Sequence, residues 1–204
     1  MRYLISIGLV CVFIFPILAQ AKSEEDNWKK KKDKNDVQCY TKEIPGSSFK
    51  AFKGETIVDA TFEALISLVF DFEHYTEWVY SCEVSRVLKK VSDEEYYTYT
   101  VNSAPWPVSD RDAVTHLKIQ EKSEDRVIIA IKGKGDLVDE TDYVRVAAAS
   151  GKWEFQKLAN GKVKVIYELH TDPSGSIPSG IANAFVVDFP YHTLRNLHKE
   201  VKLK

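Results

Sequence analysis

From Ser179 to the C-terminus the sequence has the pattern of an amphipathic helix, and such a helix needs an apolar surface to cover. One apolar stripe consists of Ile181, Phe185 and Phe189, and beyond Pro190 the apolar positions continue on another side of the helix axis. Because proline lacks an N–H and its ring clashes with the carbonyl of the preceding turn, we expect a kink at Pro190. The segment therefore predicts a kinked terminal helix that lies across whatever the rest of the chain forms.

The chain upstream of this helix has the pattern of strands joined by tight turns. We expect strands over residues 37–44, 49–58, 83–91, 95–102, 111–122, 126–134, 143–156 and 162–170. The strongest hairpin signal is Asn160-Gly161, and Gly151 indicates a bulge or bend. A further helix over residues 62–72 carries its apolar side chains on one face. This pattern predicts an α+β fold, in which a curved antiparallel sheet wraps around the C-terminal helix and leaves a hydrophobic cavity.

Residues 1–21 have the composition of a secretory signal peptide. Arg2 gives a basic start, residues 4–18 are apolar, and Ala19-Gln20-Ala21 is a small-x-small cleavage site. The apolar run is short for a membrane span and no stop-transfer pattern follows, although a retained anchor is the alternative. We therefore expect a periplasmic or secreted protein whose mature chain has no transmembrane segment.

The charge balance argues against nucleic-acid binding. The chain has 28 Lys and Arg against 30 Asp and Glu, a net charge of −2 that becomes −3 once Arg2 leaves with the signal peptide. Nucleic-acid-binding proteins instead carry clustered basic residues along one face. The hydrophobic fraction of 44% fits a single domain over residues 37–204, and because no exposed apolar seam is evident we expect a monomer.

Residues 22–36 are almost wholly charged and include a single aromatic residue, Trp28. Such a composition predicts a flexible, solvated leader. An alternative is that Lys29–Lys32 contact anionic lipid headgroups while Trp28 sits at the membrane interface. Transient contact with a membrane surface is therefore one hypothesis for this segment.

Two cysteines, Cys39 and Cys82, remain after removal of the signal peptide. In an oxidising compartment they can form a disulfide, but two lone cysteines in a domain of this size are often buried hydrophobic residues. Spacing along the chain does not fix the distance between their Cα atoms, so both interpretations stay open.

Four segments of the chain follow one another in the order found in a known family. They are Glu77-Trp78, residues 104–112 (APWPVSDRD), residues 143–155 with Gly151-x-Trp153-x-Phe155, and residues 172–183 (DPSGSIPSGIAN). Together they resemble START domains, the steroidogenic-acute-regulatory-related lipid-transfer family, and in particular its small exported bacterial members. The resemblance spans residues 36–200. It implies a helix-grip fold that encloses one lipid or other hydrophobic ligand beneath the C-terminal helix, with no catalysis and no cofactor.

The resemblance also implies roles for single residues. Trp106, Arg111 and Asp112 belong to the PxxxRD-like segment, and we interpret them as structural, with Arg111 balancing the flanking carboxylates. A ligand role for Arg111 is the alternative. Sterol- and phospholipid-binding members carry a cavity-facing arginine six residues further on, where this chain has Leu117. We therefore expect an apolar or small wall here, formed by Ala113, Thr115, Leu117 and Ile119.

The register of the preceding strand is ambiguous. Hydrophobicity alone favours Tyr97, Tyr99 and Val101 as the inward face, whereas the resemblance favours the face with Thr98, Thr100 and Asn102. With the threonine face inward, the cavity-lining candidates are Thr98, Thr100, Asn102, Ala113, Thr115, Leu117, Ile119, Val165, Tyr167, Ile181, Phe185 and Phe189.

Two functions fit these expectations. The first is a non-catalytic carrier or sensor of a lipid or another hydrophobic molecule, with the kinked helix and the 133–142 loop as moving parts. The second is an enzyme similar to polyketide cyclase/aromatases, which use polar cavity residues. The second lacks an obvious general base, because neither threonine nor asparagine titrates near neutral pH. The sequence has no HExxH, GxSxG, P-loop or GxGxxG motif, so we expect no metal and no cofactor.

Overall fold

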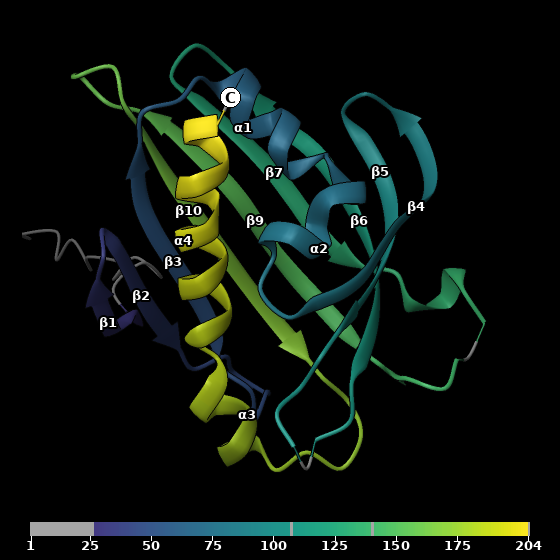
Figure 1. Ribbon diagram of the computed structural model, residues 1–204. Coiled ribbons are helices and arrows are strands. Elements are labelled where there is room, and N and C mark those ends of the chain that lie inside the picture. Colours follow the sequence, from purple (N-terminus) through teal and green to yellow (C-terminus); the bar gives the residue numbers. More distant parts are fainter. Residues whose placement is uncertain (1–26, 107, 140, 204) are drawn as a thin grey trace, which may run out of the picture.

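The computed structural model describes residues 27–106, 108–139 and 141–203, which form one strongly curved sheet with helices along its concave face (Figure 1). The expected signal peptide, residues 1–21, lies outside the described residues, as does the start of the charged leader. In the described part of the chain, no helix combines the length and the apolar character needed to cross a bilayer.

Ten described strands make up the sheet, and nine of them follow the order β1-β2-β3-β10-β9-β7-β6-β5-β4. Their bounds are β1 (Lys29–Lys34), β2 (Val37–Lys42), β3 (Ala51–Val58), β4 (Cys82–Ser92), β5 (Glu95–Asn102), β6 (Arg111–Lys122), β7 (Arg126–Gly133), β8 (Val144–Arg145), β9 (Ala148–Lys157) and β10 (Val163–Asp172). Neighbours along this order pair antiparallel, and the short β8 pairs parallel with the start of β6. The expected strand over 143–156 is thus divided into β8 and β9.

The helices are α1 (Phe62–Val69), the 3-10 turn η2 (Phe72–His74), α2 (Tyr75–Trp78), the 3-10 turn η3 (Gly135–Leu137), α3 (Ser179–Phe185) and α4 (Asp188–Leu203). Thr61 caps α1, because its hydroxyl accepts a hydrogen bond from Ala64 N at 3.2 Å. Figure 1 shows α1, α2 and α4 over the same face of the sheet, with α4 packed along β3 and β2. The predicted fold class, an α+β helix-grip arrangement, is therefore confirmed.

The C-terminal segment is divided into two helices. α3 ends at Phe185 and α4 begins at Asp188, so the predicted kink at Pro190 lies instead at residues 186–187. Pro190 falls in the first turn of α4, where proline is tolerated because an N–H there has no intrahelical partner. Gly54 favours the close approach of α4 to β3, since a Cβ atom at that position would lie 2.6 Å from Leu194 Cδ1 and 3.0 Å from Pro190 Cβ and would force α4 side chains to shift.

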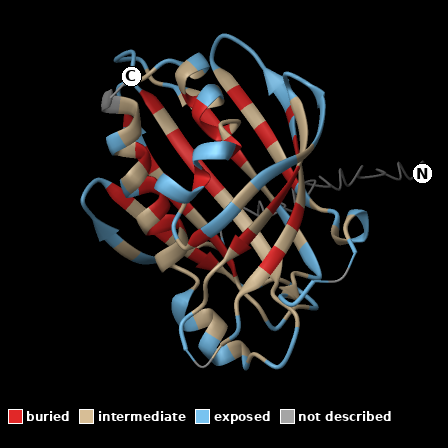
Figure 2. Ribbon diagram, turned by 45° about the vertical axis from the view of Figure 1, so that its right-hand side comes forward, coloured by how far each residue is buried: buried red, intermediate tan, exposed pale blue. Residues whose placement is uncertain are grey.

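The main core lies between the concave face of the sheet and the helices (Figure 2). The predicted apolar positions beyond Pro190 are Leu194, Leu197 and Val201; the two leucines are fully buried there, and Val201 is half-buried against the same core. Cys39 and Cys82 are also buried and do not form a disulfide. Of the two interpretations of this pair, buried hydrophobic residues is therefore the correct one. Burial raises the pKa of Cys39 to about 12 and that of Cys82 to about 11, so both thiols stay protonated at neutral pH.

The prediction of a flexible leader over residues 22–36 is wrong for its second half, which forms β1 and the turn into β2. Asn35 and Asp36 make this turn with φ angles of 53° and 60°, a conformation that these residue types tolerate. Lys32 packs on α4, with its Nζ 3.8 Å from the centre of the Tyr191 ring. Lysines are typical of edge strands, which they protect from pairing with other chains, and the apolar alternation that indicates a strand is therefore absent here.

Glu154 on β9 holds a cluster of charges on the face of the sheet opposite the main core. Its carboxylate accepts hydrogen bonds from Lys152 Nζ at 2.6 Å, Gln156 Nε2 at 2.6 Å and Arg126 Nε at 2.8 Å. Burial alone raises the pKa of a carboxyl group, but these hydrogen bonds hold the pKa of Glu154 at about 2, below its usual 4.5.

The stability contributed by Glu154 is expected to be complete above pH 4.5 and to be lost as the pH falls toward 2. The free energy of unfolding falls with falling pH because, between these two pH values, the unfolded state binds a proton that the folded state does not. Urea unfolding at neutral pH and at about pH 3 should therefore show a smaller acid-induced loss for Glu154→Gln than for the wild type. Glu121→Gln is the control, since Glu121 also pairs with Arg126 but is exposed; an equal effect in both variants would contradict the assignment.

Candidate functional site

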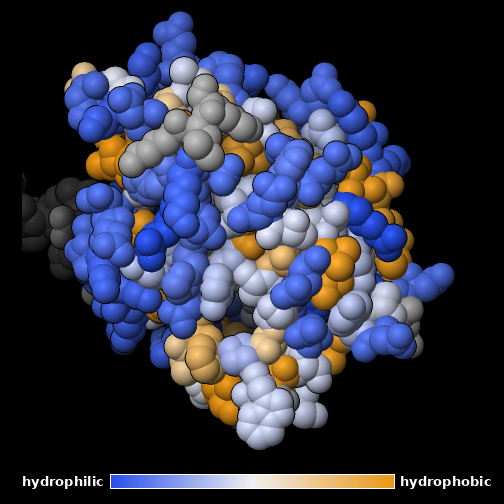
Figure 3. Space-filling model, in the orientation of Figure 1, coloured by the Kyte–Doolittle hydropathy of each residue, from blue (hydrophilic) through white to orange (hydrophobic). Residues whose placement is uncertain are grey.

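A cavity of about 330 Å³ lies between the concave face of the sheet and the two C-terminal helices. Its walls come mainly from β5, β6, β9 and β10, and from α3 and the first turn of α4. Figure 3 shows a hollow in the lower part of the molecule, beside α3, with hydrophobic side chains around it. The volume is at the lower end of the range of small-molecule sites, which is about 300–1,000 Å³.

Large apolar side chains close the inner end of the cavity. The rings of Trp153 and Tyr167 stack with their centres 3.9 Å apart, and Phe52 meets Tyr167 edge to face at 5.1 Å. Leu117 and Ile131 complete this end, and all five side chains are buried. Because none of these five side chains carries a charge, the inner end suits a hydrocarbon group.

On β5 the threonine face lines the cavity. Thr98, Thr100 and Asn102 are all lining residues. Thr98 lies opposite Thr115 of β6, and the two hydroxyl oxygens are hydrogen-bonded at 2.8 Å. The family resemblance therefore predicts the register of this strand correctly.

The face favoured by hydrophobicity alone packs elsewhere. Tyr99 and Val101 form a second, smaller buried cluster with Val114 on the other side of the sheet. Val138, from the segment between β7 and β8, covers this cluster. The tyrosine face of β5 is thus buried in a separate, smaller core, while its threonine face lines the cavity.

The other end of the cavity is open. Its border consists of half-buried or exposed residues from loops and from α3: Phe49, Lys50, Ser103, Ala104, Pro173, Ala182, Asn183 and Phe185. Asn183 holds α3 in place, because its Oδ1 accepts from Lys50 N at 2.9 Å and its Nδ2 donates to Ser48 O at 3.1 Å. The cavity thus has an apolar inner end and a partly polar mouth.

Most of the predicted lining residues come together in this cavity. They are Thr98, Thr100, Asn102, Ala113, Thr115, Leu117, Tyr167, Phe185 and Phe189. Three candidates do not line it: Ile119 and Val165 are buried in the core, and Ile181 lies on the outer side of α3 with 37% of its surface exposed. Ile181 differs because α3 is a short helix at the mouth, of which only part faces the cavity.

Other lining residues were not among the candidates, notably Trp153, Leu169 and Thr171. Alternation along β10 places Leu169 and Thr171 on the same face as Tyr167, so the sequence pattern of this strand could have predicted both as lining residues. Trp153 pairs with Tyr167 in the sheet, and its stacking on that ring depends on a register between strands that the sequence of β9 alone does not give.

Asp112 takes part in a buried ion pair with Arg145, rather than with Arg111 as predicted. The carboxylate accepts hydrogen bonds from Arg145 Nε at 2.7 Å, Arg145 Nη2 at 3.0 Å and Thr141 Oγ1 at 2.7 Å. Arg145 also donates to three backbone carbonyls of the segment between β7 and β8. The 133–142 loop, a predicted moving part, is therefore tied to β6.

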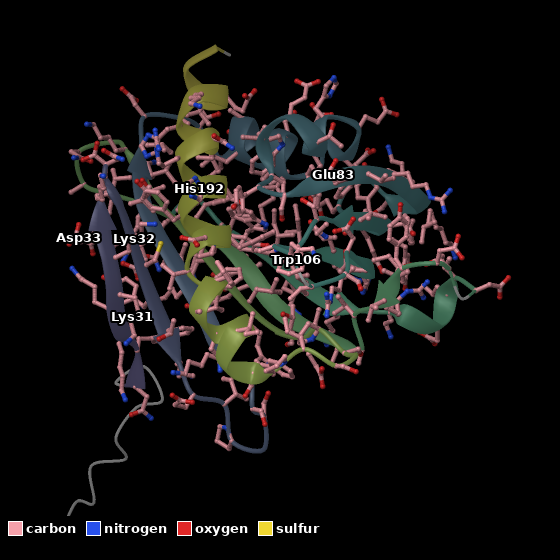
Figure 4. All side chains as sticks on the ribbon, turned by 60° about the horizontal axis from the view of Figure 1, so that its bottom comes forward. Lys31, Lys32, Asp33, Glu83, Trp106 and His192 are labelled. Atoms are coloured by element: carbon pink, nitrogen blue, oxygen red, sulfur yellow. The ribbon has the colours of Figure 1, made fainter. Side chains whose placement is uncertain are left out.

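Trp106 does not take part in the structural packing predicted for it. It lies in the loop between β5 and β6 with 92% of its surface exposed, and Figure 4 shows it away from Lys31 and Lys32, on the opposite side of the C-terminal helices. Ser103 and Ala104, in the same loop, border the cavity. Trp106 is therefore an exposed aromatic residue beside the mouth.

The tyrosine and cysteine side chains of the cavity wall do not titrate near neutral pH. Burial raises the pKa of Tyr75 and Tyr167 far above the usual value for tyrosine, as it does for the Cys82 thiol. The described lining residues include neither histidine nor a carboxylate. Within residues 27–203, apart from the two undescribed positions, no three His, Cys, Asp or Glu side chains gather as a metal site.

A curved sheet, a C-terminal helix that covers it and a cavity between them can be compared with known proteins. The profile of the START domain matches residues 17–193. The chain belongs to the START domain family. The resemblance carried by the four sequence segments is thus confirmed for the family and for the helix-grip fold.

Three known proteins show how far the similarity to START domains extends. Uncharacterized protein PA1579 of Pseudomonas aeruginosa is 32% identical over 198 residues, which are 97% of this chain and 96% of that protein. A crystal structure of the STAR-related lipid transfer protein from Xanthomonas axonopodis has a TM-score of 0.80 and 34% identity, covering 87% of this chain and 99% of that one. Human StAR-related lipid transfer protein 5 shares the fold, with a TM-score of 0.79 at 20% identity over 90% of each chain.

Proposed function

We propose that this START domain binds a lipid or another hydrophobic small molecule in the cavity, as a non-catalytic carrier or sensor. The observation that carries the proposal is the enclosed apolar inner end formed around Leu117, Trp153 and Tyr167. Each methylene group moved from water into such a space contributes about 0.8 kcal/mol, so a ten-carbon tail contributes about 8 kcal/mol before the entropic cost of binding. The family and the neighbours named as lipid transfer proteins support the same class of ligand.

The alternative, a cyclase/aromatase-like enzyme, has less support from the cavity wall. Such chemistry needs a general base that titrates near the working pH. Thr98 and Thr115 bond to each other, and burial keeps the Tyr167 hydroxyl protonated. These groups can form hydrogen bonds with a bound molecule, but they do not supply a general base near neutral pH.

Uptake of a fluorescent lipid by delipidated protein tests the proposal. We propose that the protein is a monomer, and we expect saturable binding of one fluorescent fatty acid, sterol or phospholipid analogue per chain. Tryptophan emission should be quenched in parallel, because Trp153 lines the cavity. Folded, delipidated protein that takes up none of these analogues would count against the carrier function.

We further propose that the protein is exported, and that the border of the cavity mouth touches a membrane surface when the ligand enters or leaves. Trp106 and Phe185, with 92% and 46% of their surfaces exposed, are the side chains best placed for this contact. Trp28 is less suited, because it is half-buried with Lys42 Nζ and Lys53 Nζ 5.3 Å and 5.4 Å from its ring.

Trp106→Ala is expected to weaken binding to phospholipid vesicles about fivefold, since the substitution removes about 1 kcal/mol of interfacial burial. Vesicle co-sedimentation measures the effect, and the melting temperature should not change because Trp106 packs on little of the protein. Trp28→Ala is the matched control. If Trp28→Ala reduced vesicle binding and Trp106→Ala did not, the contact would lie on β1 and not at the mouth.

A further inference from the structure

Arg111 occupies the first cavity-facing position of β6, at the mouth. Alternation along the strand puts Arg111, Ala113 and Thr115 on the cavity side and Asp112 on the other. Lys50, the other cationic lining residue, already has an anionic partner, with its Nζ 3.1 Å from Glu43 Oε1. Asp110 is the neighbouring carboxylate that acts on Arg111 through its charge, but among the described residues no carboxylate forms an ion pair with the Arg111 guanidinium, and burial of the group lowers its pKa.

The guanidinium also has a hydrogen-bond donor to spare. Arg111 Nη1 donates to the carbonyl of Ser109, but Nε is buried and has no acceptor within the described part of the chain. A buried N–H without an acceptor is destabilising, and most such groups in native structures have a partner. Asn102 pairs with Arg111 in the register, but its amide donates to Thr100 Oγ1 at 3.3 Å and Arg111 Nε stays without an acceptor among the described residues.

We propose that Arg111 binds the anionic headgroup of the ligand at the cavity mouth, while the tail of the ligand extends inward to Trp153 and Tyr167. This inference rests on the proposed function. Carboxylate and phosphate groups both present oxygen acceptors that match the planar donors of a guanidinium. Such a group would complete the hydrogen bonding of Arg111 and neutralise its charge.

The shape of the cavity restricts the ligand further. A volume of about 330 Å³ favours a molecule with one hydrocarbon chain over one with two. Further along β6 the lining residue is Leu117, and both cationic lining residues lie at the mouth, so among the described lining residues none places a positive charge at the inner end. The ligand class is therefore a single-chain anionic amphiphile, bound with its tail inward.

A pair of probes that differ only in charge tests this assignment. cis-Parinaric acid and its methyl ester share one fluorescent tail, and at neutral pH only the acid is anionic. Delipidated full-length protein is titrated with each probe, and binding is followed by energy transfer from tryptophan. The wild type should bind the acid about tenfold more tightly than the ester, the effect expected of one charge-assisted hydrogen-bonded pair.

Variants identify the residue responsible. Arg111→Gln should weaken binding of the acid to the level of the ester and leave the ester unchanged, whereas Arg111→Lys should keep most of the preference. The unchanged ester affinity shows that the glutamine variant is folded. Lys118→Gln is the control, because Lys118 lies on the same strand but on the face opposite Leu117 and does not line the cavity, and its preference should match that of the wild type. Loss of the preference in Lys118→Gln, or its retention in Arg111→Gln, would overturn the assignment.

The outcomes also separate this inference from the proposed function. If the wild type bound acid and ester equally, the headgroup site would be wrong while the hydrophobic cavity would stand. If it bound neither probe, both proposals would fail. Displacement of bound cis-parinaric acid by palmitate or by lysophosphatidate then shows whether the preferred headgroup is a carboxylate or a phosphate, and preferential displacement by either supports an anionic ligand.

Discussion

Replacing Asp112 by asparagine is expected to lower the free energy of unfolding by about 3 kcal/mol, because it removes the fully buried carboxylate to which Arg145 donates two hydrogen bonds. The asparagine amide also directs N–H donors toward a guanidinium, and a guanidinium has no hydrogen-bond acceptor. Loss of the pair should loosen the segment between β7 and β8, which Arg145 holds through three carbonyls. Urea unfolding at neutral pH measures the change.

The pH dependence of unfolding provides a second readout for Asp112. Burial alone raises the pKa of this carboxyl, but the hydrogen bonds from Arg145 and Thr141 hold it below the usual 3.8. Its contribution is therefore present above that value and is lost as the pH falls through the lowered pKa, a dependence that Asp112→Asn should remove. Asp110→Asn is the control, since the Asp110 carboxylate accepts from Ala104 N at 3.0 Å, asparagine keeps that acceptor, and no described ion pair includes Asp110. A similar loss of the free energy of unfolding in Asp110→Asn and Asp112→Asn would contradict the role assigned to the Asp112–Arg145 ion pair.

Ala113→Phe is expected to abolish lipid uptake, with affinity lower by at least about a hundredfold, while the protein remains folded. Ala113 lines the cavity between Arg111 and Thr115, and a phenyl ring there occupies space that the tail of the ligand needs. Filling an apolar cavity does not require new voids or buried charges, so the melting temperature should fall little. Titration with a fluorescent fatty acid measures the affinity.

A matched variant distinguishes blockage from general damage to the sheet. Ala130 of β7 is half-buried and lies between Ile129 and Ile131, so its side chain points to the face opposite the cavity. Ala130→Phe therefore adds the same ring to the sheet without entering the cavity, and it should bind the probe as the wild type does. Wild-type affinity in Ala113→Phe would place the ligand outside this cavity.

Patterns within single segments predicted much of the architecture. Helical spacing from Ser179 onward identified the covering helices, and hairpin signals identified the antiparallel sheet. Alternation along β6 placed Ala113, Thr115 and Leu117 on the cavity wall, and the family resemblance chose the threonine face of β5. These features depend on local periodicity or on a motif, which a sequence displays directly.

The features that were missed depend on contacts between distant segments. Asp112 pairs with Arg145 rather than with its neighbour Arg111, because the parallel pairing of β8 with β6 brings Arg145 beside it. β1 consists mostly of lysines, so no apolar alternation indicates a strand, and its pairing with β2 defines it. The exposure of Trp106 likewise follows from the path of its loop, which no property of the residue reveals.

The central claim is that the space beneath α3 and α4 holds a hydrophobic molecule. Native mass spectrometry of delipidated protein, re-isolated after incubation with vesicles that contain fatty acids, lysophospholipids, phospholipids and sterols, tests it most directly. The wild type should return the mass of one chain plus one lipid, and Ala113→Phe the mass of the chain alone. Wild-type protein that returns only the lipid-free mass would contradict the account.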